Sequence, residues 1–202
     1  MKKYNLVSKY VLRYKKKKGK GKDSVNEENK PNIVERQFND RKPLEVVASD
    51  LTYVRVGGRW HYICLLTDLH AREIIGFAAG RERDAKLVRK AFYRVNCDLR
   101  DIDIFHSDRG GEFKNEILDS IISAFGMRRS LSKKGTPVDN AVSESLYNTV
   151  KTEMIYGEVF DNLDELELEL FQFVNWYNNT RLHGSLNDLP PSEYKALVKS
   201  CN

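Results

Sequence analysis

The chain has 202 residues, of which 41% are hydrophobic and 31% charged, a balance typical of a water-soluble domain with one sizeable core. No apolar run reaches the roughly 20 residues that span a bilayer, and no apolar stretch follows the basic start, so the sequence predicts neither a membrane segment nor a secretory signal. Three scattered cysteines (Cys64, Cys97 and Cys201) form no Cys-x-x-Cys pair and are typical of a reducing compartment, so we expect a cytoplasmic protein.

The net charge of +5 is concentrated at the N-terminus. Residues 1–22 carry ten Lys or Arg and no acidic residue, whereas the remainder of the chain has a balance of −5. Residues 11–40 also lack apolar periodicity, so we expect residues 1–42 to be a basic segment and linker. One interpretation is sequence-independent contact with DNA phosphates, which releases counterions, and the other is a solvated linker rich in lysine. The lysines concerned are Lys15, Lys16, Lys17 and Lys18.

Three antiparallel strands are predicted first along the chain. Residues 46–56 are rich in β-branched and aromatic side chains, and Gly57-Gly58 predicts a two-residue hairpin turn into a second strand over 60–67. A turn at 68–72 leads into a third strand over 73–78. Asp68 lies at this hairpin end, and we interpret it as a turn residue rather than a metal ligand.

Helices and strands alternate in the remainder of the chain. Asp84 predicts the N-cap of a helix that runs to residue 96, and the later segments predict two short strands and three more helices. The predicted fold class is α/β, with a mixed five-stranded sheet flanked by helices, which is the arrangement of the ribonuclease-H-like fold. We expect a core over 43–157 and a helical C-terminal extension over 158–202. The predicted strands are 103–106 and 127–131, and the predicted helices are 115–125, 140–155 and 164–177.

Three carboxylates are candidates for metal-dependent chemistry. Asp50 lies in the middle of a largely apolar strand, where an acidic residue is unfavourable unless it is paired or metal-bound. Asp108 ends a strand just before Gly110-Gly111, and Glu144 lies in the first turns of a helix. Taken singly, Asp108 is typical of a turn and Glu144 of a solvated surface. Taken together, three oxygen ligands suit Mg²⁺ or Mn²⁺, and two such ions can activate the attacking oxygen and stabilise the leaving oxygen at a phosphodiester.

The helix that carries Glu144 has two distinct faces. At about 100° per residue, one face holds Glu144 together with other polar side chains, and the opposite face is apolar. Thr136-Pro137 can begin this helix, and Asp139 or Asn140 can cap it instead. The residues within about 60° of Glu144 are Asn140, Tyr147, Asn148 and Lys151, and those opposite are Val142, Leu146 and Val150.

The motifs around these carboxylates resemble those of a known family. The stretches at 50–53 (Asp-Leu-Thr-Tyr), 106–113 (His-Ser-Asp-Arg-Gly-Gly-Glu-Phe) and 134–145 are similar to the DDE motifs of the OrfB product of the IS-three family of insertion-sequence transposases, which are relatives of retroviral integrases. The 35 residues between Asp108 and Glu144 match the family's spacing. A second match follows at Trp176-Tyr177-Asn178-Asn179-x-Arg181-x-His183 and continues to Tyr194.

The resemblance implies a DNA transposase. Asp50, Asp108 and Glu144 match the metal-binding catalytic triad, which holds two Mg²⁺ or Mn²⁺ ions, cleaves DNA at the element ends and transfers strands through the freed 3′-OH. The implied partners are transposon-end and target DNA, further copies of the chain in a homo-multimer, and a full-length or upstream-frame transposase, in the bacterial cytoplasm at the nucleoid. Candidate DNA contacts besides the lysine tail are Lys151, Asn148, Asn140, Lys133 and Lys134.

Two other functions compete with this interpretation. Relatives carry a helix-turn-helix-like region before the core, and residues 1–10 look like its last segment, so the chain is alternatively a truncated DNA-binding regulatory fragment without productive transposition. The second competing function is that of a ribonuclease-H-like nuclease acting on RNA–DNA hybrids. The Trp176 motif and the carboxylate spacing argue against it. We interpret His106 as shaping the strand end beside Asp108, and Trp176 and Tyr177 as packing residues.

Overall fold

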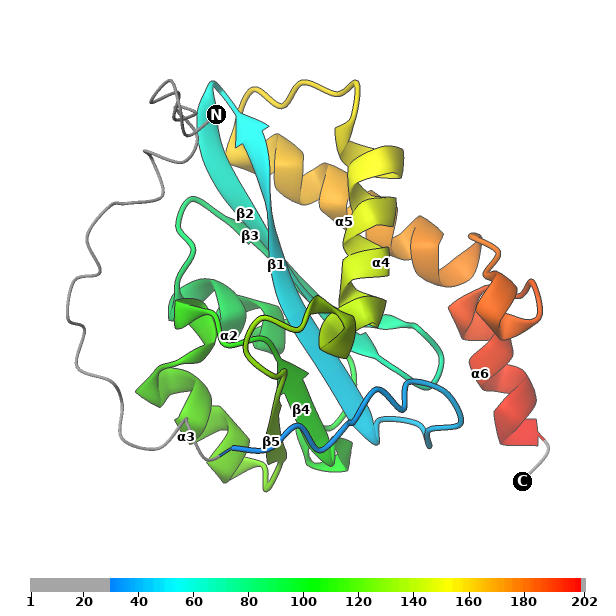
Figure 1. The fold of residues 1–202 in the computed structure, drawn as a ribbon. Helices are drawn as coiled ribbons and strands as arrows, with labels where there is room; N and C mark the ends of the chain where they lie inside the picture. The colour runs from blue at the N-terminus through cyan, green and yellow to red at the C-terminus, as the bar shows by residue number, and fades with distance from the viewer. Residues whose placement is uncertain (1–29, 201–202) are drawn as a thin grey trace, which may run out of the picture.

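The structure is a computed structural model, and it describes residues 30–200 (Figure 1). The proposed phosphate contacts of Lys15 to Lys18 lie outside these residues, as does Cys201. Cys64 and Cys97 are both free thiols. Among the helices within residues 30–200, none has both the length and the apolar composition needed to cross a membrane.

The five strands form one mixed sheet in the order β3-β2-β1-β4-β5. β1 to β3 form an antiparallel meander, and β4 and β5 lie parallel to β1, which confirms the predicted five-stranded mixed sheet. Gly57 and Gly58 make the first hairpin turn with φ of 52° and 76°, a left-handed backbone that favours glycine. The strands are β1 (Val46–Val56), β2 (Arg59–Asp68), β3 (Ile74–Gly80), β4 (Ile104–Ser107) and β5 (Arg128–Leu131).

β1 is paired on both sides over only its first third. Val46 to Ser49 pair with β4, and the register ends with Ser49 opposite Ser107. From Asp50 onward, within the described part of the chain, β1 pairs with β2 alone, apart from one isolated bridge between Val56 and Phe160. The middle of β1 therefore has an open edge, and it begins at the first candidate carboxylate.

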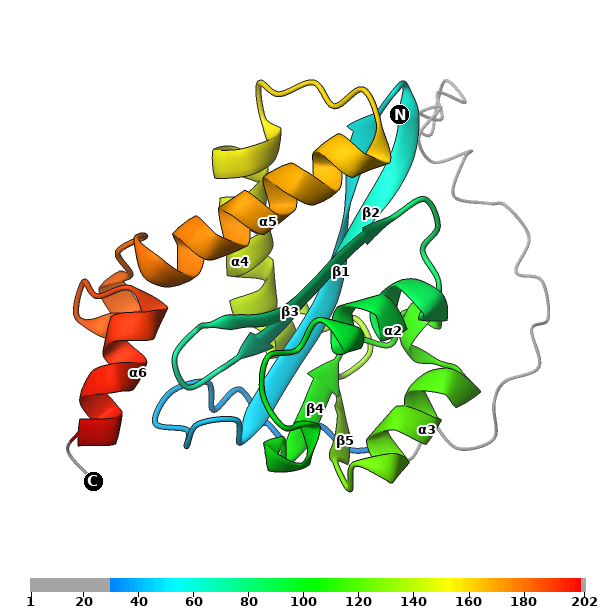
Figure 2. The same cartoon turned by 180° about the vertical axis from the view of Figure 1, so that it is seen from behind.

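Helices cover both faces of the sheet (Figures 1 and 2). α2 and α3 pack on one face with the cluster around Phe105, and α4 and α5 pack on the other with the cluster around Leu65. Asp84 and Asn115 cap α2 and α3 by accepting from backbone N–H groups at 3.0 and 2.9 Å. The α-helices are α2 (Ala85–Tyr93), α3 (Glu116–Ala124), α4 (Ala141–Val150), α5 (Leu163–Asn179) and α6 (Pro191–Ser200), and the short turns are η2 (Leu99–Asp101), η3 (Gly111–Phe113), η4 (Pro137–Asn140), η5 (Lys151–Ile155) and η6 (Gly184–Leu186).

The helix expected over 140–155 is divided into three parts. A 3-10 turn, η4, precedes α4, and a π-helical turn, η5, follows it, so regular α-helix covers only Ala141–Val150. Neither Thr136 nor Asn140 caps through its side chain. The Asp139 carboxylate instead accepts from Lys133 N–H at 3.0 Å and from Arg36 Nε at 2.7 Å, because these donors lie on segments brought beside η4 by the fold.

The segment just before β1 differs from the linker that composition favours. Val34 is fully buried in a cluster with Val46 and Ala48 of β1, and Ile33 and Phe38 pack against the same cluster. Three apolar side chains in six residues are too few to form a recognisable period, yet they cover the end of the sheet. Residues 30–40 therefore brace the start of β1 and the loop before α4.

Gly76 lies where β3 crosses closest to α2. A Cβ added there would stand 2.7 Å from the Ala91 carbonyl oxygen and 2.8 Å from Val95 Cγ2. The Ala91 carbonyl can move away only if the backbone of α2 shifts, so we expect Gly76→Ala to lower the free energy of unfolding by about 1–3 kcal/mol. Urea unfolding monitored by circular dichroism measures it, with Gly111→Ala as control because no atom lies within 4 Å of its added Cβ. Equal stability of the two variants would contradict the tight contact.

Candidate active site

The three candidate carboxylates line one hollow of about 400 Å³. Asp50 comes from the middle of β1, Asp108 directly follows β4, and Glu144 lies in the first turn of α4. The parallel pairing of β1 and β4 ends at Ser49 and Ser107, so the next residue of each strand is an aspartate at the same edge. The other residues that line the hollow are Arg109, Gly110, Ser132, Lys133, Lys134, Gly135, Thr136 and Asn140.

Asp50 is half-buried beside like charges. The Leu51 N–H donates to its Oδ1 at 2.8 Å. Burial raises the pKa of Asp50 to about 7, and the charges of Asp108 and Glu112 add to the rise, while the Leu51 hydrogen bond opposes it. The protein alone therefore disfavours the ionised form of this carboxylate, and a cation at the same place would favour it.

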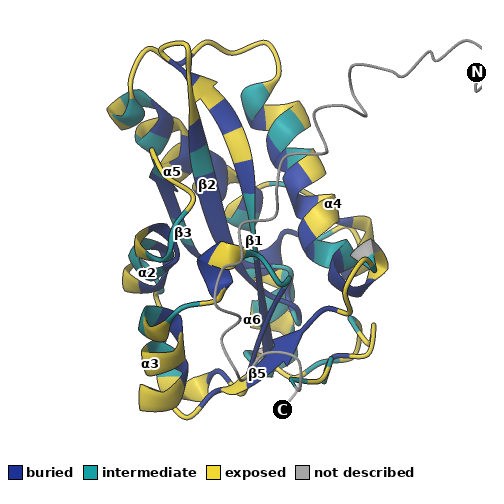
Figure 3. Cartoon of the chain, turned by 60° about the vertical axis from the view of Figure 1, so that its left-hand side comes forward, coloured by how far each residue is buried: buried dark blue, intermediate teal, exposed yellow. Residues whose placement is uncertain are grey.

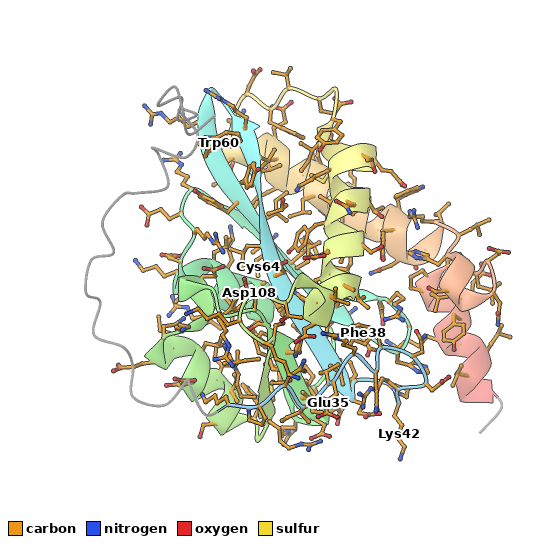
Figure 4. The ribbon with its side chains drawn as sticks, viewed as in Figure 1. Glu35, Phe38, Lys42, Trp60, Cys64 and Asp108 are labelled. Carbon is orange, nitrogen blue, oxygen red and sulfur yellow. The ribbon has the colours of Figure 1, made fainter. Side chains whose placement is uncertain are left out.

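Asp108 and Glu144 face the hollow from its two sides. The Asp108 Oδ1 accepts from Gly110 N–H at 2.8 Å, which turns the loop back toward the carboxylate, and the Ser107 hydroxyl donates to the Asp108 carbonyl at 2.9 Å. Glu144 is exposed, as expected for a ligand on the open side of a helix. Figure 4 shows Asp108 beside β1 near the lower end of α4.

Tyr147 joins α4 to the strand that carries Asp50. Its hydroxyl donates to the Asp50 carbonyl and accepts from Leu65 N–H at 3.0 Å, so it bridges β1 and β2. The helical projection places Tyr147 on the same face as Glu144, but the structure buries it against the core. In the sequence, the one sign of this bridging role was the position of Tyr147 between the polar and the apolar face of the helix.

A fourth carboxylate, Glu112, lies close enough for its charge to raise the pKa of Asp50. It is buried and pairs with Arg83 from the loop before α2, whose Nε donates to Oε1 at 2.8 Å. The Glu112 carboxylate occupies the space that a side chain at Gly110 would need. Sequence reasoning missed both residues as parts of the site, because the loop that carries Arg83 is 29 positions away along the chain.

His106 is a buried connector rather than a base facing the hollow. It is fully buried, its Nε2 donates to the Asp139 carbonyl at 3.0 Å, and its Nδ1 accepts from the Ser130 hydroxyl at 2.9 Å. Burial lowers the pKa of His106, which favours the neutral ring. His106 thus ties β4, β5 and η4 together below Asp108, in agreement with the interpretation as a shaping residue.

The structure also agrees with the interpretations of Asp68 as a turn residue and of Tyr177 as a packing residue, whereas Trp176 is 37% exposed. Asp68 accepts from Leu44 N–H at 3.2 Å and His70 N–H at 3.1 Å at the β2–β3 turn, and it does not line the hollow. In the C-terminal motif, Tyr177 is buried and the Asn178 side chain bonds both the N–H and the carbonyl of Ile74, at 3.0 and 2.9 Å. This motif secures α5 to β3 by packing and hydrogen bonding.

The predicted DNA-contact residues separate into two groups. Lys133, Lys134 and Asn140 line the hollow with the carboxylates. Lys151 and Asn148 do not. Lys151 lies about two turns beyond Glu144, with its ammonium 5.6 Å from the centre of the Tyr53 ring, and Asn148 is exposed on α4. Arg109, which sequence reasoning did not select, also lines the hollow and donates through Nε to the Ser132 carbonyl at 3.0 Å.

The donor chemistry of the hollow fits a hard divalent cation. Its acidic groups are all carboxylates, whose oxygens Mg²⁺ and Mn²⁺ prefer, and burial together with the charges of Asp108 and Glu112 raises the pKa of Asp50. Within residues 30–200, no three His, Cys, Asp or Glu side chains are drawn together tightly enough to form a finished metal site. The three carboxylates share one hollow without meeting at one point.

Comparison with known proteins defines the class first. Integrase core domain models match residues 40–137 and 125–191. The catalytic core of the HTLV-2 integrase in complex with magnesium aligns with a TM-score of 0.60 at 10% identity, covering 75% of this chain and 96% of that one. The BIV integrase catalytic core aligns with a TM-score of 0.54 at 15% identity, covering 78% and 97%. The fold is that of an integrase catalytic core, and the predicted ribonuclease-H-like arrangement is confirmed.

Curated relatives then define the family. The transposase of insertion sequence element IS904 from Lactococcus lactis subsp. lactis is 30% identical over 170 residues, covering 82% of this chain and 67% of the relative. The putative transposase InsK of element IS150 from Escherichia coli K12 is 30% identical over 169 residues, covering 82% and 59%. The chain belongs to the insertion-sequence transposases with an integrase core domain. It spans about three-fifths to two-thirds of the length of these relatives.

Proposed function

We propose that this chain is the catalytic core of a DNA transposase, which cleaves phosphodiester bonds at transposon ends and joins the freed 3′-OH to target DNA. The observation that supports it most is the convergence of Asp50, Asp108 and Glu144 on one hollow that also holds Lys133 and Lys134. Carboxylates suit divalent cations, and lysines suit the phosphates on either side of the cleaved bond.

Each residue has a distinct part in the proposed reaction. Asp50, Asp108 and Glu144 would hold one or two Mg²⁺ or Mn²⁺ ions. When bound, such ions supply Lewis-acid stabilisation of the attacking and leaving oxygens of an in-line displacement. Lys133 and Lys134 bind the DNA backbone electrostatically and set its position over the carboxylates.

The supporting residues keep this arrangement in place. Tyr147 holds β1 against α4, so the Asp50 and Glu144 carboxylates stay on facing walls of the hollow. Asn140 lines the hollow one turn before Glu144 and can orient a phosphate oxygen or the attacking hydroxyl through its amide. No covalent link between protein and DNA is needed, because the attacking oxygen belongs to water or to the DNA itself.

The partners proposed from the family are DNA and further copies of the chain. Two transposon ends must be joined, so we propose a multimer on DNA, and an HTLV-2 integrase core with magnesium is described in trimeric and dimeric forms. A full-length or upstream-frame transposase is a further proposed partner. The site of action of such a protein is the bacterial nucleoid.

The proposed function is tested by metal-dependent turnover on labelled duplex DNA. We expect nicked or joined products in Mg²⁺ or Mn²⁺, none in EDTA, and none from Asp108→Asn, because this change removes an anionic ligand while preserving shape. Gel electrophoresis under denaturing conditions resolves the products. Salt-sensitive DNA binding by both proteins without any products would contradict the catalytic proposal and favour the regulatory-fragment alternative.

A further inference from the structure

One face of the β1–β2 hairpin carries exposed aromatic side chains. The strand register places Tyr53 opposite Tyr62 and Arg55 opposite Trp60, so all four side chains share one face of the ribbon. Tyr53 is 57% exposed and Trp60 51% exposed, although both lie in regular strands of the central sheet. Neither α2 nor α3, which cover this face lower down, reaches these two rings.

Positive charge lies directly against these rings. The Arg55 guanidinium is 5.2 Å from the centre of the Trp60 ring, and the Lys151 ammonium is 5.6 Å from the centre of the Tyr53 ring. The two rings themselves meet edge to face at 5.1 Å. Across residues 30–200, neither Arg55 nor Lys151 forms a salt bridge with a carboxylate. The face therefore combines flat apolar surface with cations that the protein does not neutralise.

The aromatic face lies beside the candidate active site. Tyr53 is three residues beyond Asp50 along β1, which is about 10 Å in a strand and places the two side chains on opposite faces of it. β1 has an open edge over this stretch, and Lys151 spans that edge from the turn after α4 to Tyr53. Figure 4 shows Trp60 at the upper end of the hairpin, above Asp108, and Figure 3 shows exposed bands along the upper part of β1 beside α4.

We propose that Tyr53 and Trp60 form a base-stacking platform for an unpaired or terminal nucleobase of the DNA strand bound at the carboxylates. The proposal rests on the proposed function. Bases inside a duplex stack on one another, so only an unpaired or terminal base has a free face for an aromatic ring. Arg55 and Lys151 attract the phosphates on either side of such a base. The platform would hold a strand splayed from the duplex a short distance from the bond that is cleaved.

The test measures binding of the full chain to two DNA probes in EDTA, where no cleavage interferes. One probe is a short blunt duplex, and the other is the same duplex with an unpaired overhang. Trp60→Ala is expected to lose on the order of 10-fold in affinity for the overhang probe and little for the blunt duplex, whereas Trp60→Tyr keeps most of the affinity. In a Trp176→Phe protein, which leaves Trp60 as the one tryptophan, emission is expected to be quenched by the overhang probe.

Trp176→Phe by itself is the matched control, since it alters the other tryptophan, which is 37% exposed on α5. Wild-type affinity of Trp60→Ala for the overhang probe, or an equal loss for both probes, would overturn the platform. If Trp60→Ala changes the oligomeric state measured by light scattering but not the affinity for DNA, the face binds a second copy of the chain. That result would also overturn the platform. Cleavage in Mn²⁺, measured in parallel, tests the proposed function separately, because the binding result does not depend on turnover.

Discussion

Replacing Glu144 with Gln is expected to lower metal-dependent strand cleavage on the order of 10³-fold, because the several kcal/mol that metal ions contribute to a phosphoryl-transfer transition state depend on their anionic ligands. Glutamine keeps the shape of the side chain and loses only its charge. Glu144 is exposed on the open side of α4, so its replacement leaves no buried group without a partner. Folding and non-specific DNA binding are therefore expected to stay close to those of the wild type.

Single-turnover cleavage of labelled duplex DNA in Mn²⁺ measures this effect, and circular dichroism with a DNA-binding isotherm checks the fold. The matched control is Glu116→Gln, which removes an exposed carboxylate from the first turn of α3, as Glu144→Gln does from the first turn of α4. Any loss caused by the helix dipole alone then appears in both variants. Cleavage at the wild-type rate by Glu144→Gln would rule out its place in the triad.

Replacing Tyr147 with Phe is expected to lower the free energy of unfolding by about 2–4 kcal/mol, because two buried backbone groups lose their partner at once. The hydroxyl accepts from Leu65 N–H and donates to the Asp50 carbonyl, and the side chain is 5% exposed. For a chain of this size the melting temperature is expected to fall by about 5–15 °C. Because Asp50 loses its tie to α4, cleavage is expected to fall as well.

Differential scanning calorimetry gives the melting temperature, and Tyr93→Phe is the control, since Tyr93 is 77% exposed on α2. If Tyr147→Phe has the same melting temperature as the wild type, another group such as water replaces the hydroxyl, and the hydroxyl does not secure β1. A large loss of stability in Tyr93→Phe would show instead that any tyrosine change has this effect.

The electrostatics of the site support the proposed cation. Asp50 experiences the negative charges of both Asp108 and Glu112, and only Arg83 offsets them among the charges that act most strongly on it. Arg83 is bound to Glu112 in a pair in which the carboxylate is almost fully buried. The charge of Glu112 is thus compensated within the protein, and the proposed cation would compensate the charges of the two aspartates.

The sequence by itself determined the class of fold and selected the three candidate carboxylates. The β-branched and aromatic residues of β1, the glycine pair that follows it and the capping residue Asp84 are local signals, and these signals survive in the structure. The carboxylates were recognisable because an acidic residue in an apolar strand is costly and because motif spacing is a property of the chain itself.

Only the tertiary structure decided which residues support the carboxylates. Arg83 and Glu112 meet across 29 positions, and Tyr147 reaches Asp50 across 97. Residues 33–38 seal the sheet with too few apolar side chains to show a period. The open edge of β1, on which the proposed stacking platform depends, exists because β4 ends at Ser107. Contacts between distant segments arise from packing of the whole chain, and no local propensity encodes them.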